Sequence, residues 1–148
     1  MWSVFLSWVN SICKSRPVRE ASGRISVSNG GFSVYSDEVL CWELGCDEIT
    51  RVVAFKRDLL TTDLICFGFE KLDAKGTLWC VHEEMPGFED FAVELGRITD
   101  GAWPARFKDV AHPAFEECWT ELWNADPTQP IDKLPSLIWA EPPECSQD

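Results

Sequence analysis

One histidine in this chain has neighbours that would suit acid–base chemistry. His82 is followed directly by Glu83 and Glu84, and a histidine with a carboxylate partner in a cleft can act as a general base. A small hydrolase that uses His82 and Glu83 is therefore one functional hypothesis. The apolar alternation around it, however, predicts a strand in which His82 shares a face with Leu78 and Cys80. Glu83 and Glu84 then point to opposite sides of that strand, so they do not form a carboxylate pair.

The remaining motifs do not assemble an active site. His112 follows Asp109 by three positions, but it precedes Pro113, which indicates the entry of a helix. The chain contains no G-x-S-x-G elbow, no P-loop and no dinucleotide-binding fingerprint. These patterns favour a protein that is not an enzyme.

The cysteines indicate neither a metal site nor a disulfide framework. Seven are present, an odd number without repeated spacing, as expected for a reducing, cytoplasmic protein. Cys41 and Cys46 are separated by four residues, which approximates one zinc-ligand pair. A second pair is missing and His82 and His112 are isolated, so we expect no metal and no cofactor.

Negative charge is concentrated in the second half of the chain. The formal net charge is −12, and residues 83–148 hold fifteen acids against four bases. Nucleic acid is excluded as a partner, because such a charge repels phosphate, whereas a basic protein would be attracted. Solubility alone is the simpler explanation of the charge. The residues expected to bind a partner are Glu83, Glu84, Glu89, Asp90, Glu116, Glu117 and Glu121, with Trp103 and Trp123 as aromatic anchors.

The spacing of apolar residues near the N-terminus predicts an amphipathic helix over residues 1–20. Trp2, Phe5, Val9 and Ile12 share one helical face, and basic residues follow at 14, 16 and 19. A secretory signal has its charge before the apolar stretch, so export is not indicated. Two alternatives remain: the helix docks on the domain, or residues 1–19 bind a membrane surface.

A series of strands is predicted over 24–83. Residues 24–36 indicate a hairpin, because Asn29-Gly30 suits the positive φ angles of a tight primed turn. Further strands are expected at 38–43, 48–57, 64–70 and 77–83.

The apolar residues of two of these strands predict which side chains share a face. In 64–70, Ile65, Phe67 and Phe69 alternate with the other side chains. In 48–57, Ile49, Val53 and Phe55 are expected on one face, and a β-bulge would explain the broken alternation there.

The periodicity then changes to that of helices. Apolar residues from Phe88 to Ile98 recur at helical spacing. A second helix is expected after Pro113, with an inward face of Phe115, Cys118, Trp119 and Leu122. The predicted organisation is a single domain over 21–126, followed by an extended, proline-rich acidic tail over 127–148.

Strands in succession followed by helices predict an α+β fold. The expected architecture is an antiparallel meander or bent barrel of five to seven strands, capped by one or two C-terminal helices. Residues 31–98 resemble bacterial pleckstrin-homology-like domains, a resemblance carried by the segments GFSV at 31–34, Trp42, DEI at 47–49, VVAFK at 52–56, DLI at 63–65 and EEMPGFEDF at 83–91. This resemblance implies a bent antiparallel barrel closed by a helix and a role in binding peptides, proteins or phosphoinositides. The turn at 58–62 is not basic, which does not fit binding of a phosphoinositide head group.

The composition leads to one functional expectation. A small, acidic, single-domain protein is similar to immunity proteins of bacterial toxin systems, which block basic toxins by complementary charge. We therefore expect a non-catalytic protein-binding module with an acidic face, and its most concrete form is an immunity-type inhibitor of a basic bacterial toxin. The alternatives are the membrane-surface module and the small hydrolase described above.

Overall fold

A computed structural model describes residues 23–58, 63–112, 118–128 and 135–140. The predicted N-terminal helix over 1–20 and much of the 127–148 tail lie outside the described residues. So do Glu116 and Glu117, two of the expected partner-binding acids.

The first three strands form an antiparallel meander of their own. They are β1 (Gly23–Ser28), β2 (Gly31–Ser36) and β3 (Val39–Gly45), in that spatial order. The β1–β2 hairpin confirms the prediction for 24–36.

The primed turn, however, is not where the sequence placed it. Of Asn29 and Gly30, only Gly30 has a positive φ, at 81°. The turn between β2 and β3 has two consecutive positive φ angles, 50° at Asp37 and 64° at Glu38, as a type I′ turn requires. A short side chain such as that of Asp37 tolerates this conformation, so this turn forms without glycine.

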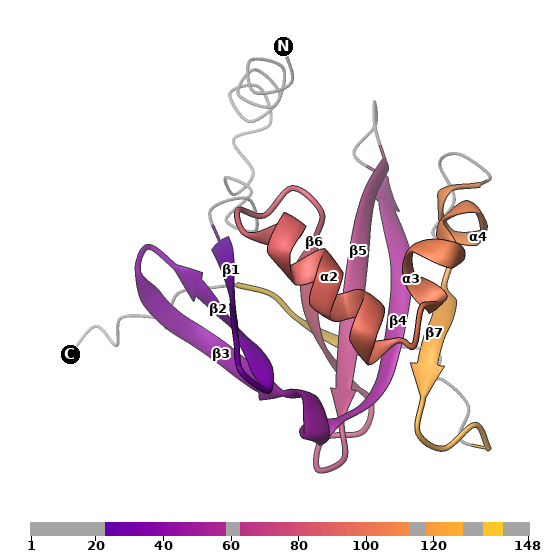
Figure 1. The fold of residues 1–148 in the computed structure, drawn as a ribbon, viewed down its shortest axis with the longest axis horizontal. Coiled ribbons are helices and arrows are strands. Elements are labelled where there is room, and N and C mark those ends of the chain that lie inside the picture. The colour runs from indigo at the N-terminus through magenta and orange to yellow at the C-terminus, as the bar shows by residue number, and fades with distance from the viewer. Residues whose placement is uncertain (1–22, 59–62, 113–117, 129–134, 141–148) are drawn as a thin grey trace.

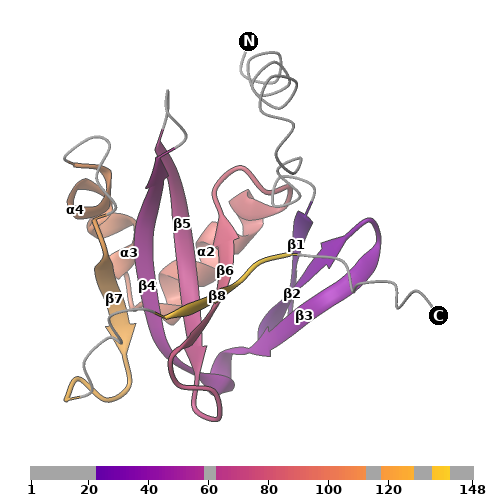
Figure 2. The ribbon, with the colours of Figure 1, turned by 180° about the vertical axis from the view of Figure 1, so that it is seen from behind.

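A second sheet of five strands follows a short 3-10 turn, η2 (Cys46–Glu48). Its strands are β4 (Ile49–Asp58), β5 (Asp63–Lys71), β6 (Thr77–His82), β7 (Thr120–Asn124) and β8 (Ser136–Ile138). The spatial order is β7-β4-β5-β6-β8 (Figures 1 and 2). All described pairings are antiparallel except that of β6 with β8, which is parallel.

Three helices pack on one face of this second sheet. They are α2 (Phe88–Ile98), α3 (Ala102–Ala105) and α4 (Phe107–Ala111), and Figure 1 shows them in front of the strands. The bounds of α2 confirm the predicted helix. Within the described residues, no helix has the length and apolar character needed to cross a membrane.

The helix predicted after Pro113 is wrong in its second half. Thr120–Asn124 is strand β7, which pairs with β4. Leu122 is buried and Trp119 stacks on Phe55, with ring centroids 4.2 Å apart. Leu122 and Trp119 therefore do face apolar neighbours, as predicted. Leu122 does so from strand β7, and Trp119 from the residue that directly precedes this strand.

The main core lies between the two sheets and α2. Phe32 of β2 packs against Phe69 of β5 at 5.0 Å and against Phe91 of α2 at 4.7 Å between ring centroids. One side chain thus joins all three layers. Ile65, Phe67 and Phe69 belong to this core, which confirms their predicted common face.

A smaller apolar cluster covers the opposite face of the second sheet. It contains Val53, Phe55, Leu64, Cys66, Leu78 and Cys80, with Trp139 packed against it. Ile49 instead belongs to the main core, so its predicted common face with Val53 and Phe55 is wrong. The reason is a register shift between Ile49 and Arg51, at the bulge that the sequence indicated.

These elements confirm the α+β class. The described strands form two separate sheets, and they do not close into one barrel. The segment predicted as an extended tail also contains a strand, because β8 pairs with β6 and extends the second sheet.

Candidate functional site

The loop between β6 and α2 surrounds a hollow of about 380 Å³ with acidic walls. Its lining residues are Glu83, Met85, Pro86, Gly87, Phe88, Glu89 and Asp90. We call this feature the acidic hollow. Three of the acids predicted to bind a partner line it, and Glu84, a fourth, is exposed in the same loop.

Backbone contacts with β1 hold the loop in place. The N–H of Ile25 donates to the carbonyl oxygen of Pro86 at 2.8 Å. Gly87 has a φ of 88°, and a Cβ at this position would collide with the carbonyl oxygen of Ile25. Only glycine combines a positive φ with the absence of a side chain at low energetic cost. Gly87 therefore allows the start of α2 to pack closely against β1 of the first sheet.

Glu83 has a structural role as well as a place in the hollow. Its N–H donates to the carbonyl oxygen of Ile65 at 3.1 Å, and its Oε1 accepts the N–H of Ile65 at 3.1 Å. The carboxylate thus replaces a backbone carbonyl where the β5–β6 ladder ends. Burial of the carboxyl group raises the pKa of Glu83, and the charge of Glu84 adds to this, while the hydrogen bond from Ile65 opposes it.

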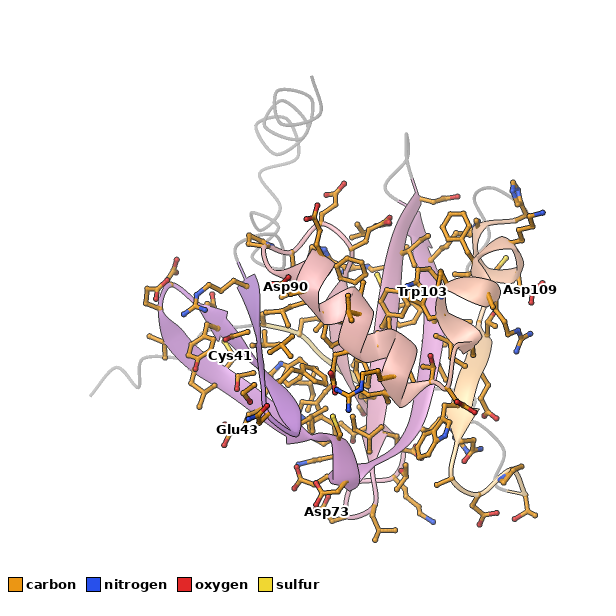
Figure 3. The ribbon with its side chains drawn as sticks, in the orientation of Figure 1. Cys41, Glu43, Asp73, Asp90, Trp103 and Asp109 are labelled. Atoms are coloured by element: carbon orange, nitrogen blue, oxygen red, sulfur yellow. The ribbon has the colours of Figure 1, made fainter. Side chains whose placement is uncertain are left out.

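Glu89 and Asp90 are the outward-facing acids of the site. Both are exposed in the first turn of α2, where the helix dipole favours negative charge. Figure 3 shows Asp90 at the beginning of this helix. In the described part of the chain, no basic side chain forms an ion pair with Glu84, Glu89 or Asp90. The ion pairs of the described residues therefore leave these three carboxylates without a neutralising base.

The predicted aromatic anchors are not on this surface. Trp103 is 8% exposed and packs edge-on against Phe67 at 4.8 Å between centroids, and Figure 3 shows it between the helices and the sheet. Trp123 is half-buried in β7 and packs against the main core. Neither side chain projects as an anchor from the domain.

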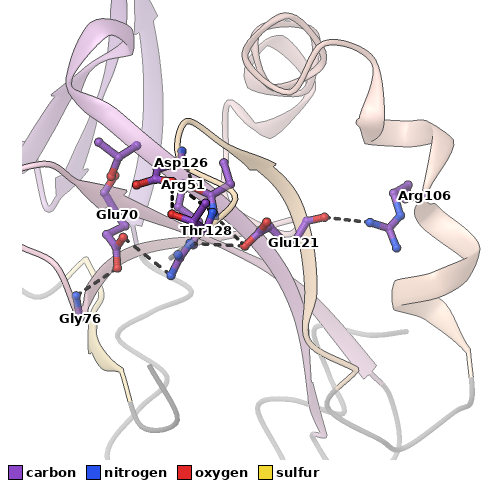
Figure 4. A network of polar contacts seen from close by, with 9 residues as sticks. Arg51, Glu70, Gly76, Arg106, Glu121, Asp126 and Thr128 are labelled. Carbon is purple, nitrogen blue, oxygen red and sulfur yellow. Dashed lines mark hydrogen bonds and ion pairs between the residues drawn. The ribbon is translucent and has the colours of Figure 1, made fainter. Parts of the chain in front are cut away.

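Glu121 belongs to an ionic network around the buried Arg51 (Figure 4). Arg51 is 3% exposed, and its guanidinium lies 3.8 Å from Glu70 and 3.4 Å from Glu121. A second oxygen of Glu70 accepts the N–H of Gly76 at 3.0 Å. These acids neutralise an internal cation that joins β4, β5 and β7, so Glu121 is less available to a partner than was expected.

Where the structure describes them, the histidines and cysteines do not gather into a reactive cluster. His82 is 1% exposed and faces Trp139, with ring centroids 6.5 Å apart. It therefore lies beside Trp139, which packs against the smaller apolar cluster. The hydrolase hypothesis gains no accessible base from His82. His112 is exposed at the end of α4. Among the described residues, no group of three histidine, cysteine or acidic side chains could hold a metal ion.

A second hollow was not anticipated from the sequence. It has a volume of about 420 Å³ and lies between β3 and β8, lined by Cys41, Trp42, Trp79, Leu137, Ile138 and Trp139. We call it the aromatic groove. The three tryptophans are visible in the sequence, but their proximity depends on the pairing of β8 with β6, for which the sequence shows no local signal.

Comparison with known proteins identifies no relative. No protein-family model, curated protein or solved structure matches this chain.

Proposed function

We propose that this protein is a non-catalytic protein-binding module that recognises a basic partner through the acidic hollow and the adjoining acids. The observation that carries the proposal is the placement of Glu83, Glu89 and Asp90 around one hollow of about 380 Å³. The partner-binding residues in this proposal are Glu83, Glu84, Glu89 and Asp90.

The walls of the acidic hollow suit a long basic side chain. Met85, Pro86 and Phe88 give apolar surface for the methylene stem of a lysine or arginine. Glu89 and Asp90 are exposed beside it for the charged head group. The remaining negative charge of the chain would accelerate the encounter with a basic protein.

An immunity-type inhibitor of a basic bacterial toxin is the most specific form of this proposal. It is supported by the net charge of −12 in a chain of 148 residues. The toxin domain would present a lysine or arginine to the acidic hollow, and binding would cover the toxin surface around it. A toxin gene beside the gene of this protein would supply the partner for a direct test.

For the fold, we propose that the bent meander of the pleckstrin-homology-like family is the nearest description. The antiparallel neighbours β2–β3 and β4–β5–β6, followed by α2, support it. An experimental structure in which the two sheets pack face to face without bending would contradict this proposal.

The binding test compares two sets of neutralised acids. The first variant combines Glu83→Gln, Glu89→Gln and Asp90→Asn in the acidic hollow, and the control combines Glu43→Gln with Asp73→Asn, which lie elsewhere on the surface (Figure 3). We expect the first variant to bind the basic toxin domain at least ~10-fold more weakly at low salt, a loss of about 1.4 kcal/mol. The control variant should bind within about twofold of the unmodified protein.

Isothermal titration calorimetry at low and high sodium chloride gives the decisive comparison. Salt should weaken binding of the unmodified protein and narrow the difference between the two variants, because exposed charges are screened. Equal affinity at both salt concentrations, or equal affinity of the two variants, would refute recognition by the acidic hollow.

A further inference from the structure

The aromatic groove is an apolar surface between two strand edges. Among the described strands, β3 pairs only with β2 and β8 only with β6, so the groove lies between their free edges. Leu137 and Ile138 are 39% and 36% exposed where they line it. Val39 and Leu40, which precede the lining residue Cys41 in β3, are each 45% exposed. Exposed apolar side chains gathered along a hollow mark a contact surface.

One polar atom in the groove lining lacks a partner. Trp42 is 8% exposed, and its indole Nε1 has no hydrogen-bond acceptor among the described residues. Buried indole N–H groups normally donate to an acceptor, and an unsatisfied buried donor costs about 1–3 kcal/mol. A segment that fills the groove and brings an oxygen atom would satisfy this donor.

The described part of the chain begins beside this groove. Gly23 packs against Ala140, which directly follows the groove residue Trp139, and a Cβ at Gly23 would lie 2.7 Å from the Cβ of Ala140. Ile12 precedes Gly23 by eleven residues, a span of up to about 36 Å when extended. A segment tethered so closely has an effective concentration on the order of millimolar, so even a weak contact would be occupied.

We propose that residues 2–12 of this chain bind in the aromatic groove as an amphipathic segment. Trp2, Phe5, Val9 and Ile12 form its apolar face. Their counterparts in the groove are the exposed Leu137 and Ile138 and the half-buried Trp79 and Trp139. Ser3, Ser7 and Asn10 lie on the opposite side of such a helix, so their polar side chains would remain in contact with water.

Docking would also bring positive charge to the acidic hollow. Gly23 lies next to Met85, which lines that hollow, because a Cβ added at Gly23 would be 3.0 Å from the Cε of Met85. Lys14, Arg16 and Arg19 connect the docked segment to Gly23, so they would compete with a basic partner for Glu89 and Asp90. This competition rests on the proposed function, whereas the docking itself does not.

The chain carries its own probes for docking. Cys13 directly follows the segment, and Cys41 lines the groove. Burial raises the pKa of the Cys41 thiol, so cross-linking with a short bis-maleimide is best done at mildly alkaline pH, where more thiolate is present. In the monomeric full-length protein, we expect peptide mass spectrometry to find Cys13 linked to Cys41, and far less link between Cys13 and Cys118.

Two substitutions separate docking from chance encounters of a tethered segment. Val9→Asp places a charge on the apolar face, and Ser7→Asp adds the same charge on the polar side. Val9→Asp should abolish the Cys13–Cys41 link and make Cys41 react several-fold faster with a single maleimide, while Ser7→Asp leaves both unchanged. Both variants should retain the thermal unfolding midpoint of the unmodified domain within a few degrees, because neither substitution changes a residue of the two apolar cores.

Three outcomes would overturn the proposal. The first is equal Cys13–Cys41 linkage in both variants, and the second is linkage found only in covalent dimers, which would assign the groove to a second copy. The third is linkage that is absent in solution while residues 1–19 bind anionic phospholipid vesicles in a sedimentation assay. Failure of the competition alone, with linkage intact, would count against the proposed function and not against docking.

Discussion

Arg51 illustrates how burial determines the role of a charged side chain in this protein. It is 3% exposed between Glu70 and Glu121, whereas Arg24 forms an ion pair with Glu38 at the surface. Both pairs look alike in the sequence, as a base and an acid more than a dozen residues apart. Their energetic weight differs, because a buried charge that loses its partner cannot be solvated by water.

Removal of the Glu70 carboxylate tests this difference. We expect Glu70→Ala to lower the free energy of unfolding by about 3 kcal/mol, since it removes the more buried of the two carboxylates that lie beside Arg51. Glu38→Ala should cost less than about 1 kcal/mol, because its side chain is 82% exposed. Urea unfolding followed by tryptophan fluorescence measures both, and equal losses would show that the Arg51 network stabilises the fold no more than the surface ion pair of Arg24 and Glu38 does.

The raised pKa of Glu83 predicts that the free energy of unfolding depends on pH through this single side chain. Burial raises the pKa of Glu83 in the folded protein from its ordinary value of 4.5. Its contribution to stability is then fully present below that value and is lost as pH rises through the folded pKa. Glu83→Gln keeps an oxygen that can accept the N–H of Ile65 but does not titrate. The variant should therefore gain stability relative to the unmodified protein between about pH 4 and pH 7.

Chemical denaturation at a series of pH values measures this effect. The quantity of interest is the free energy of unfolding of Glu83→Gln minus that of the unmodified protein. A Glu84→Gln variant, which removes one negative charge from the same loop, serves as the matched control. A difference for Glu83→Gln that falls as pH rises would have the wrong sign for a raised pKa.

At the scale of elements, α2 is the part that the sequence specifies best. Its apolar spacing marks one face, and Phe91 and Leu95 on that face are fully buried. Val93 lies on the other side and is 71% exposed. Local periodicity decided this element because a helix satisfies its backbone hydrogen bonds within itself.

Substitutions on the two sides of α2 should differ sharply. Phe91→Ala removes the ring that contacts Phe32 and Phe69, and we expect it to lower the free energy of unfolding by about 3–5 kcal/mol. Val93→Ala should change it by no more than about 0.5 kcal/mol. Denaturant melts of both variants test the assignment, and a mild effect of Phe91→Ala would place α2 outside the main core.

At the scale of the whole molecule, the negative charge is the dominant property. The net charge is −12 and the isoelectric point is about 4.5. Like charges on a compact surface repel one another more than they do on an expanded chain. The same field that would attract a basic partner therefore lowers the stability of the free protein.

Salt should relieve this repulsion. We expect the thermal unfolding midpoint at pH 7 to rise as sodium chloride increases from a few millimolar to the physiological range, because screening shortens the reach of surface charges. Near pH 4.5 the net charge is close to zero, and the same salt should have little effect. Scanning calorimetry at both pH values tests this, and a midpoint that falls with salt at pH 7 would show that attractive ion pairs outweigh the net repulsion.

Part of the acidic hollow was predictable and part was not. Glu83 and Glu84 end a predicted strand, and Glu89 and Asp90 begin a predicted helix, so four acids had to lie close together around one short loop. The loop conformation, in contrast, depends on contact with Ile25 in another sheet. The aromatic groove depends entirely on such distant contacts.

The sequence alone determined the class α+β, α2 and the inward face of β5, because their signals repeat within a few residues. It did not determine that Thr120–Asn124 is a strand, that Ser136–Ile138 joins β6, or that Trp103 is buried. A strand gains its hydrogen bonds from a partner elsewhere in the chain, and a side chain is buried only by the elements that pack over it. Those partners are brought together by the tertiary structure, so only that structure could decide them.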